Sequence, residues 1–549
     1  MKNLDPSYIE NQVDSQPGLT EPVSGAQGAQ TARRAPGQRS LSAKEREQRQ
    51  LALGATVPTK EEAMCQCTKV LHFGMFFDGT GNNRNEEMAK PAEKRALSNV
   101  AKLWAAHQED RDIVRRYVPG LGTPYAEIGD SGGMLGNAIG KGGEPRIKKA
   151  LKLLDEELAK VPKQQKVLLI NLTVFGFSRG AALARAFVRD LAQKCETKDE
   201  AYEYQGIPIR VAFAGLFDTV CSAYDSLISA MTTSNGGHNG WAAGMTLPPM
   251  VEQSVHMNAA HEQRRRFPLD STRIDARYPD NTVEIWYPGV HSDVGGGYAP
   301  QFQGRNNGIS RFALNHMFDL AFAGGVLFNR IEALDPSLQD EFNKSDPALR
   351  EAYNAYIDAV PVKTGPMEEV QAAHMLMLHR WHKKRALAKV ALGSVQRLQA
   401  QRDRARGLRN EARAKQAALI ASVGWQDPGM PEYLDPDTRA RLDALRKEVK
   451  AHDDDLDEAE SALKDLKQEE RKFLSDIAEL RRWRAEGKQL GLRDRTLLQA
   501  WDDDSELPEQ VQVFFDTFAH DSVAHFNYDT SRLTDWRTIY FGGTKYKPT

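Results

Sequence analysis

Runs of hydrophobic residues alternate with amphipathic segments over the first two thirds of the chain. Continuous apolar runs, typical of strands buried on both faces, occupy 69–77, 114–118, 167–177, 209–217 and 282–287. Segments with helical character lie between them, at 97–108, 145–159 and 179–194. Strands that alternate with helices predict the α/β class, with a mostly parallel sheet covered by helices on both faces.

The pattern changes after about residue 366, where long helices follow. From Leu442 to Leu480 the apolar positions recur in alternating steps of three and four, which is typical of a coiled coil. Residues 382–420 carry a weaker seam rich in Ala and Arg, and three prolines in 424–437 would end a helix between the two segments. We therefore expect an inserted antiparallel coiled-coil hairpin. Its role is open between a loading platform, a membrane-contacting arm and a cover over the site.

These patterns divide the chain of 549 residues into four parts. Residues 1–64 are rich in Gln, Ala, Ser, Gly, Pro and Arg, which predicts a disordered tail with room for a short helix at 43–53. The α/β part is expected at 65–365 and the helical insertion at 366–490. Aromatic residues become frequent again near the C-terminus, so we expect 491–549 to return to the main core.

Charge and cysteine content exclude several classes of protein. The chain has 73 Lys and Arg against 75 Asp and Glu, and a net charge of -2 argues against a nucleic-acid partner. No apolar run approaches the ~18–20 residues that a membrane span needs. Four cysteines are too few for a disulfide scaffold, and Cys65 with Cys67 lacks the second ligand pair of a zinc site. We expect no metal and no cofactor.

The N-terminal residues lack the apolar segment of a signal peptide. We therefore expect the chain either to stay in the cytoplasm or to leave through a machine that needs no cleaved signal.

The segment Gly176-Phe177-Ser178-Arg179-Gly180 fits the G-x-S-x-G pattern of a nucleophile elbow. Ser178 follows the most apolar run and precedes helix-favouring residues, so a sharp strand-to-helix turn would lift its hydroxyl above the sheet edge. The two glycines remove side chains that would clash in such a turn. The backbone N–H of Arg179 would then face a developing oxyanion. The alternative is an ordinary turn whose serine caps the helix.

A serine needs a base, and in this fold the chain order is Ser, acid, His. Asp218 closes the strand 210–217, where its carboxylate would stand at the carboxyl edge of the sheet, and Asp225 is the reserve candidate. His291 follows the strand 283–287 in a Gly-rich loop, which suits a general base. Helix capping by Asp218 and a surface role for His291 are the alternatives.

Other motifs carry weaker signals. Gly79, after the first strand, is either a second oxyanion donor or part of a tight turn without a catalytic role. His520 is interpreted as structural, because it lies far beyond the other candidates. Lys141 lacks the Ser or Thr that follows the lysine of a phosphate loop. The basic run 261–267 is interpreted as a solvated helix face, with contact to lipid phosphate as the alternative.

Four motifs in this order resemble the first family of type VI secretion lipase effectors, which are bacterial α/β-hydrolase phospholipases. They lie at 76–83, 176–181, 216–220 and 288–298. The resemblance covers 68–328, with a possible return at 511–541. It implies a phospholipase A that hydrolyses membrane glycerophospholipids through an acyl-enzyme. It also implies that Ser178 is the nucleophile, that His291 is the base, and that Asp218 or Asp225 is the acid.

The same resemblance implies delivery into the periplasm of a neighbouring bacterium. The implied partners are the phospholipid membrane, a spike protein of the secretion apparatus and a cognate immunity protein. Two other hypotheses are kept: a soluble carboxylester hydrolase acting on non-lipid esters, and a catalytically inert coiled-coil interaction protein. The mechanism needs no metal, and Asp-rich loops leave structural calcium open.

Overall fold

The computed structural model describes residues 19–20, 34–54, 68–133, 142–221, 238, 240–275, 277–422, 434–523, 533, 536–541 and 544–546. Asp225, Cys65, Cys67 and Lys141 lie outside the described residues.

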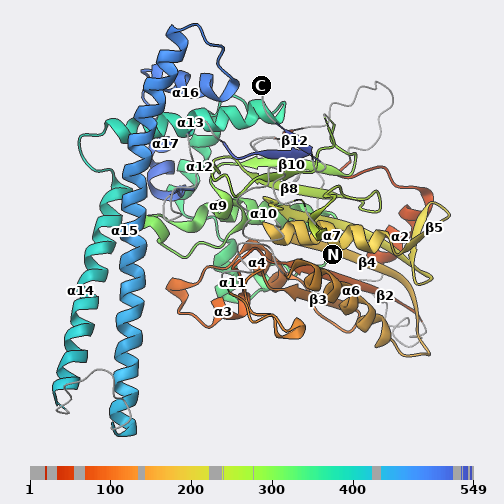
Figure 1. Ribbon diagram of the computed structural model, residues 1–549. Coiled ribbons are helices and arrows are strands. Elements are labelled where there is room, and N and C mark those ends of the chain that lie inside the picture. Colours follow the sequence, from red (N-terminus) through yellow and green to blue (C-terminus); the bar gives the residue numbers. More distant parts are fainter. Residues whose placement is uncertain are drawn as a thin grey trace.

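A mostly parallel sheet forms the centre of the protein (Figure 1). Among the described residues it has nine strands, and seven of them follow the order β1-β10-β8-β7-β4-β2-β3. In that order they are Leu19–Thr20, Thr282–Tyr287, Ser254–Ala259, Ile207–Phe217, Lys166–Phe177, Thr68–Phe77 and Ile113–Val118. The edge strand β1 is antiparallel, and the five other pairings along this path are parallel. The α/β class predicted from the sequence is confirmed.

Five shorter strands complete the β structure of the described residues: two join the main sheet and three form a separate sheet. β5 (Cys195–Lys198) and β6 (Ala201–Tyr204) form a hairpin that pairs with β7. β9 (Leu269–Ser271) pairs in parallel with β11 (Ile539–Phe541), which pairs in turn with β12 (Thr544–Tyr546). The C-terminal segment is thereby tied to the body of the molecule.

Helices cover both faces of the sheet. The helices of the first half are α2 (Ala43–Gly54), α3 (Arg84–Met88), α4 (Asn99–Ala106), α6 (Gly143–Ala159) and α7 (Arg179–Ala192). Those of the second half are α9 (His291–Gly295), α10 (Ser310–Ala323), α11 (Pro336–Phe342), α12 (Pro347–Ala359), α13 (Met367–Leu387), α14 (Gly393–Ser422), α15 (Pro436–Ala485), α16 (Leu492–Asp502) and α17 (Glu509–Val513). Helices α6 and α7 share one apolar core with the sheet, while α4, α10 and α11 share a second core. Because β4 is buried on both faces, its sequence is a continuous apolar run.

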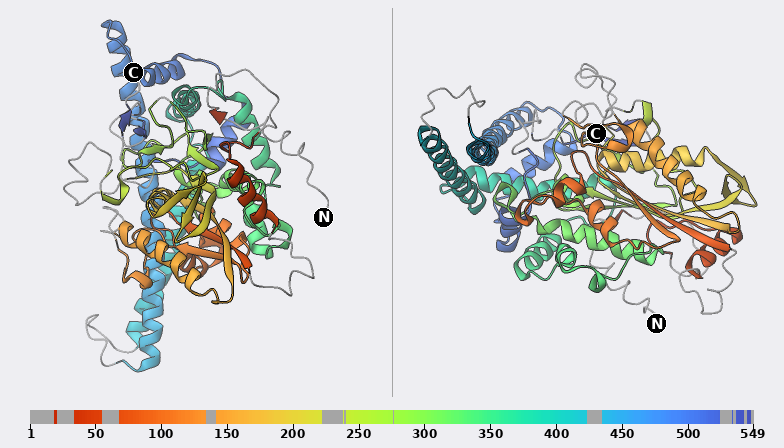
Figure 2. Two further views of the ribbon diagram at one scale, coloured as in Figure 1. Left: turned by 90° about the vertical axis from the view of Figure 1, so that its right-hand side faces the viewer. Right: turned by 90° about the horizontal axis from the view of Figure 1, so that it is seen from below.

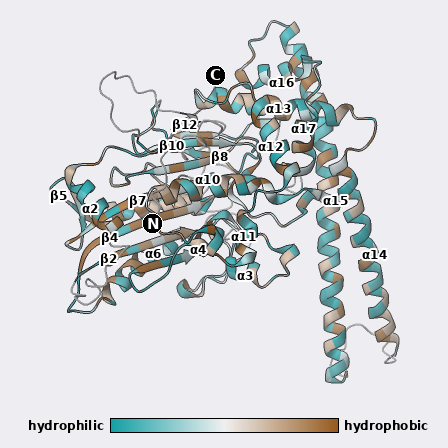
Figure 3. Ribbon diagram, turned by 180° about the vertical axis from the view of Figure 1, so that it is seen from behind, coloured by the Kyte–Doolittle hydropathy of each residue, from teal (hydrophilic) through white to brown (hydrophobic). Residues whose placement is uncertain are grey.

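Helices α14 and α15 form an antiparallel hairpin that projects beside the end of the body where α9 lies (Figures 1 and 2). The ion pairs Arg406–Glu460 and Arg413–Asp453 fix its direction, because later residues of α14 face earlier residues of α15. Helix α15 begins where Asp435 caps two backbone N–H groups ahead of Pro436. Figure 3 shows that the hairpin is largely hydrophilic, whereas the strands of the sheet are hydrophobic.

The expected hairpin boundary at residue 366 is corrected by α13. This helix packs with α12 and the segment 507–519 in one apolar cluster of the body, through residues such as Met375 and Trp381. The apolar residues of α13 lie on all sides of the helix, which is typical of a buried helix. The sequence of α13 therefore has no amphipathic pattern from which the start of the hairpin could be predicted. The chain leaves helical structure at Ala388, and the hairpin itself begins at α14.

Residues 34–54 of the expected disordered tail are ordered, and α2 confirms the short helix for which the sequence left room at 43–53. Helix α2 packs Ala52 against Val70 and Leu169, and Arg39 binds both Glu45 and the carbonyl of Val251. One buried alanine and one ion pair leave little hydrophobic periodicity for a sequence pattern to detect. Among the described helices, none combines the length and the apolar character that crossing a membrane requires.

Candidate active site

Ser178 occupies the turn between β4 and α7, as the elbow pattern predicts. Its backbone has φ 58° and ψ -127°, a conformation that is strained for a residue with a side chain. The strand β7 supports the turn, because the N–H of Ser178 donates to the carbonyl of Phe217 at 2.9 Å. A Cβ on Gly180 would collide with the carbonyl oxygens of Phe77 and Asp78, so the helix can approach β2 only with glycine there.

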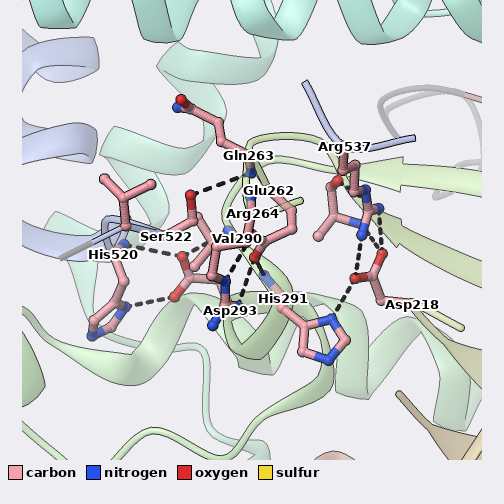
Figure 4. Close-up of polar contacts among 12 residues, drawn as sticks. Asp218, Glu262, Gln263, Arg264, Val290, His291, Asp293, His520, Ser522 and Arg537 are labelled. Atoms are coloured by element: carbon pink, nitrogen blue, oxygen red, sulfur yellow. Dashed lines mark hydrogen bonds and ion pairs between the residues drawn. The ribbon is translucent and has the colours of Figure 1, made fainter. Parts of the chain in front are cut away.

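Asp218 and His291 are in direct contact (Figure 4). Asp218 directly follows β7, is fully buried, and has a positive φ of 42°. Its Oδ1 accepts a hydrogen bond from the N–H of Ala259 at 2.8 Å, and its Oδ2 lies 2.5 Å from Nδ1 of His291. His291 is the first residue of α9, and three residues separate it from the end of β10. Two residues that are far apart in the sequence thus form an acid–imidazole pair.

The ring of His291 lies next to the nucleophile elbow. It packs on the ring of Phe177, the neighbour of Ser178, with 4.7 Å between ring centroids, and on Phe267 from another side at 4.9 Å. In the described part of the chain, Nε2 of His291 has no hydrogen-bond partner, so it is not bonded to the hydroxyl of Ser178. In free enzymes the catalytic hydrogen bonds are often long or unformed, and they tighten only when substrate binds. The carboxyl ends of β4 and β7 and the start of α9 therefore bring the three candidates to one edge of the sheet.

Burial and charge set the protonation of this pair. Burial alone would raise the pKa of Asp218, but the Arg537 guanidinium and the contact with His291 hold it well below its usual range. Burial lowers the pKa of His291, against the raising effect of Asp218. An ionised carboxylate beside a neutral imidazole is the resting state that a general base requires.

The backbone N–H of Gly79 is already engaged. It donates to Oδ1 of Asp78 at 2.7 Å, and the hydroxyl of Tyr117 bonds the other carboxylate oxygen. Burial raises the pKa of Asp78 to about 6, against the hydrogen bonds from Ser98, Tyr117 and Gly79. Gly79 could serve an oxyanion only if its bond to Asp78 opened. Arg179, in contrast, lies at the positive end of α7, as predicted.

The interpretation of 261–267 as a solvated helix face is wrong. Residues 261–264 are buried, and only Arg265 and Arg266 are exposed. Glu262 accepts both guanidinium bonds of Arg264 and the backbone N–H of His291 at 3.2 Å. Because Arg264 is neutralised within the run itself, a stretch that looks basic in the sequence can lie beneath the candidate base.

Three contacts at the site are not predicted by the sequence. Glu262 supports the backbone of His291, and Arg537 binds Asp218. Asp293 accepts from the ring of His520 at 2.6 Å and from its N–H at 3.0 Å, which ties the C-terminal segment to the loop of His291. His520 therefore contacts Asp293 rather than the candidate nucleophile. These contacts join residues that are 29, 227 and 319 positions apart, so no local pattern marks them.

Two clusters of the described residues have the side chains of a cation site. They are Cys221 with His238 and Asp270, and His382 with Glu469 and Asp521. In the second cluster the guanidinium of Arg385 contacts both carboxylates and takes the place of a cation. In the first, the carboxylate of Asp270 already bonds both the N–H of Cys221 and the ring of His238. Neither cluster includes Ser178, Asp218 or His291.

Residues 73–195 and 188–320 match the family described as T6SS, Phospholipase effector Tle1-like, catalytic domain. This part of the chain is similar to the Tle1-like catalytic domain. The match contains Ser178, Asp218 and His291, and it confirms the resemblance that the four motifs indicated. The Tle1-like region ends before the hairpin and before Arg537. No curated protein matches the chain.

Two solved structures are similar to the whole chain or to part of it. A crystal structure of an uncharacterized protein from Pseudomonas aeruginosa has a TM-score of 0.66 at 22% identity, covering 94% of this chain and 85% of that chain. This similarity extends the shared fold well beyond the Tle1-like region. A structure of the Tle1 effector bound to the VgrG spike from the Type 6 secretion system has a TM-score of 0.37 at 20% identity, covering 56% of this chain and 83% of that chain.

Proposed function

We propose that the chain is an antibacterial phospholipase A that hydrolyses acyl esters of membrane glycerophospholipids. Ser178 is the nucleophile, His291 the general base and Asp218 the acid of the triad. The single observation that carries the proposal is the 2.5 Å contact between Asp218 and His291 beside a strained serine turn. The Tle1-like family supplies the substrate class, because its members are described as phospholipase effectors.

The chemistry proceeds in two acyl-transfer steps. Nε2 of His291 takes the proton of the Ser178 hydroxyl as its oxygen attacks the ester carbonyl carbon. The tetrahedral oxyanion is stabilised by the N–H of Arg179 at the start of α7. The lysophospholipid leaves with the proton from His291. Water, deprotonated by His291, then cleaves the acyl-serine, and the fatty acid departs while Ser178 regains its proton.

Asp218 orients the imidazole and balances its charge in both steps. It presents Oδ2 to Nδ1 of His291, which fixes the tautomer that leaves Nε2 free to accept the serine proton. Because the carboxylate is buried and ionised, it stabilises the imidazolium that forms in each transition state.

The test is product analysis on vesicles of defined phospholipids that carry different acyl chains at the two glycerol positions. Wild type should release one fatty acid and a lysophospholipid, and the chain released identifies A1 or A2 activity. Ser178→Ala and His291→Ala should release neither, whereas Ser337→Ala, an exposed serine on α11, should behave as wild type. Unchanged hydrolysis by Ser178→Ala would contradict the proposal. Cleavage of short-chain esters without vesicle hydrolysis would favour a soluble carboxylester hydrolase, and no ester cleavage an inert interaction protein.

The family description as a type VI secretion effector supports the rest of the proposal. The chain is loaded on a spike protein of the producer, delivered to the periplasm of the target cell, and neutralised in the producer by an immunity protein. Expression directed to the periplasm should be toxic for wild type and harmless for Ser178→Ala. Equal toxicity of both, or toxicity confined to cytoplasmic expression, would contradict this route.

A further inference from the structure

A buried arginine from the far end of the chain holds the carboxylate of Asp218 (Figure 4). Arg537 has no exposed surface, and its two terminal nitrogens donate to the two carboxylate oxygens at 2.7 and 2.6 Å. The nitrogen that binds Oδ1 also donates to the carbonyl of Ala259 at 3.0 Å. The guanidinium is therefore fixed at three acceptors around Asp218.

The strand pairing of the C-terminal segment sets the position of Arg537. Strand β11 pairs in parallel with β9, with Ile539 opposite Leu269, and the N–H of Leu269 donates to the carbonyl of Thr538 at 2.8 Å. Arg537 directly precedes these contacts, and it lies outside the Tle1-like match, which ends at residue 320. The candidate triad is thus completed by a segment that the family region does not contain.

The geometry of the pair matters for the base. A planar guanidinium that binds both carboxylate oxygens fixes the plane of the carboxylate as well as its charge. A buried carboxylate facing only a neutral imidazole would lack a counter-charge, which is costly in the interior. Arg537 supplies that charge, so Asp218 stays ionised without requiring His291 to be protonated.

We propose that Arg537 is a positioning residue of the catalytic centre: it orients Oδ2 of Asp218 toward Nδ1 of His291 and keeps the carboxylate from holding His291 as an imidazolium. The proposal rests on the proposed function, because it assigns Arg537 a role in the same acyl-transfer site. Arg537 acts through Asp218 and touches neither the ester nor Ser178.

The charged groups that face His291 form two neutral pairs. Asp218 from β7 is balanced by Arg537, and Glu262, after β8, is balanced by Arg264. Removing the Arg537 charge leaves the negative charge of Asp218 uncompensated, so the proton on the Asp218–His291 pair is bound more tightly. Since the base must be unprotonated to act, kcat/KM falls as the pH drops through the pKa of this pair. A raised pKa therefore moves the acid limb of the profile to higher pH.

The experiment measures the pH profile of ester hydrolysis for wild type, Arg537→Met, Arg537→Lys and Arg305→Met. Arg537→Met should lower kcat about 10²–10⁴-fold with little change in KM, and move the acid limb up by about one to three pH units. Arg537→Lys restores the charge without the planar fork, so its acid limb should return to the wild-type pH while kcat stays reduced. Arg305 is a buried arginine bound to carbonyls of Gln303 and Phe515, and Arg305→Met should keep the wild-type acid limb.

Circular dichroism and thermal unfolding show which variants fold. The proposal would be overturned if Arg537→Met folds and has the acid limb and the kcat of wild type. If Arg537→Met does not fold, a wild-type kcat in Arg537→Lys would overturn the proposal. Ser178→Ala in the same assay separates the two proposals. Activity in Ser178→Ala contradicts the proposed function, whereas an inactive Ser178→Ala beside a fully active Arg537→Met contradicts only the role of Arg537.

Discussion

The body of the protein buries several of its ion pairs, whereas the ion pairs that join α14 to α15 lie at the surface. In the body, Arg210 binds both carboxylate oxygens of Glu252, and the side chains are 4% and 2% exposed. In the hairpin, Arg413 and Asp453 are 52% and 34% exposed. A buried pair is strongly destabilising to break, because it leaves an unpaired charge, while an exposed pair contributes little.

The apolar contacts of the two regions also differ, because the hydrophobic clusters of the body are larger than that of the hairpin. The sheet buries two extended cores, one on each face. The hairpin is closed at its base by a small cluster of Leu398, Ala462, Leu463 and Leu466. The body therefore specifies one arrangement of its strand ends, which a catalytic triad requires. The apolar seam of the hairpin is narrow, and its exposed ion pairs contribute little to the free energy of folding.

Arg210→Met tests the buried pairs and should have the largest effect. It leaves the carboxylate of Glu252 buried without its cation, and we expect the free energy of unfolding to fall by about 3–5 kcal/mol in urea titrations. Arg210→Met combined with Glu252→Leu should recover most of this loss. A loss below about 1 kcal/mol in the single variant would show that the body does not depend on its internal charges.

Leu466→Ala tests the thin seam of the hairpin. Leu466 is buried between α14 and α15, so the variant should lose about 2–4 kcal/mol in thermal or urea unfolding. Leu474→Ala is the matched control on the same helix, because Leu474 is 41% exposed and should change stability by less than about 0.5 kcal/mol. Equal effects would contradict a hairpin that is held by its seam.

Glu469→Gln tests the place where the hairpin meets the body. Glu469 of α15 contacts Arg385, and burial together with the charge of Asp521 raises its pKa to about 8. A raised pKa means that Glu469 favours folding most below pH ~4.5 and that this contribution is lost as the pH rises through 8. Glutamine mimics the protonated carboxyl, so the variant should gain about 1–3 kcal/mol over wild type between pH 5 and 8.5.

Calorimetry across that range measures the gain, with Glu460→Gln as the exposed control on the same helix. A parallel pH dependence in wild type and Glu469→Gln would mean that Glu469 is ionised in the folded protein.

Arg413→Ala should have the smallest effect. Its partner Asp453 is exposed, and we expect a change of at most about 0.5 kcal/mol that disappears in high salt. A larger loss at high salt would show that the hairpin depends on its surface charges, and it would remove the contrast with the body.

The sequence predicts those parts of the fold and site that depend on residues close together in the chain. The elbow around Ser178 and the strand ends before Asp218 and His291 follow from runs of neighbouring residues, and the α14–α15 seam follows from its period. Arg537 gave no signal, because its position depends on a strand pairing between segments far apart in the chain. The sequence pattern does not separate α13 from the hairpin, because a helix buried on all sides has no polar face to mark its surroundings.

The central claim is that the hydroxyl of Ser178 is activated by His291 and Asp218. Its most direct test is intact-protein and peptide mass spectrometry after incubation with a fluorophosphonate, which reacts with activated serines. We predict one adduct, on Ser178, that is absent in Ser178→Ala and forms at least about 10³-fold more slowly in His291→Ala. An adduct on another serine, or equally fast labelling of His291→Ala, would contradict the account.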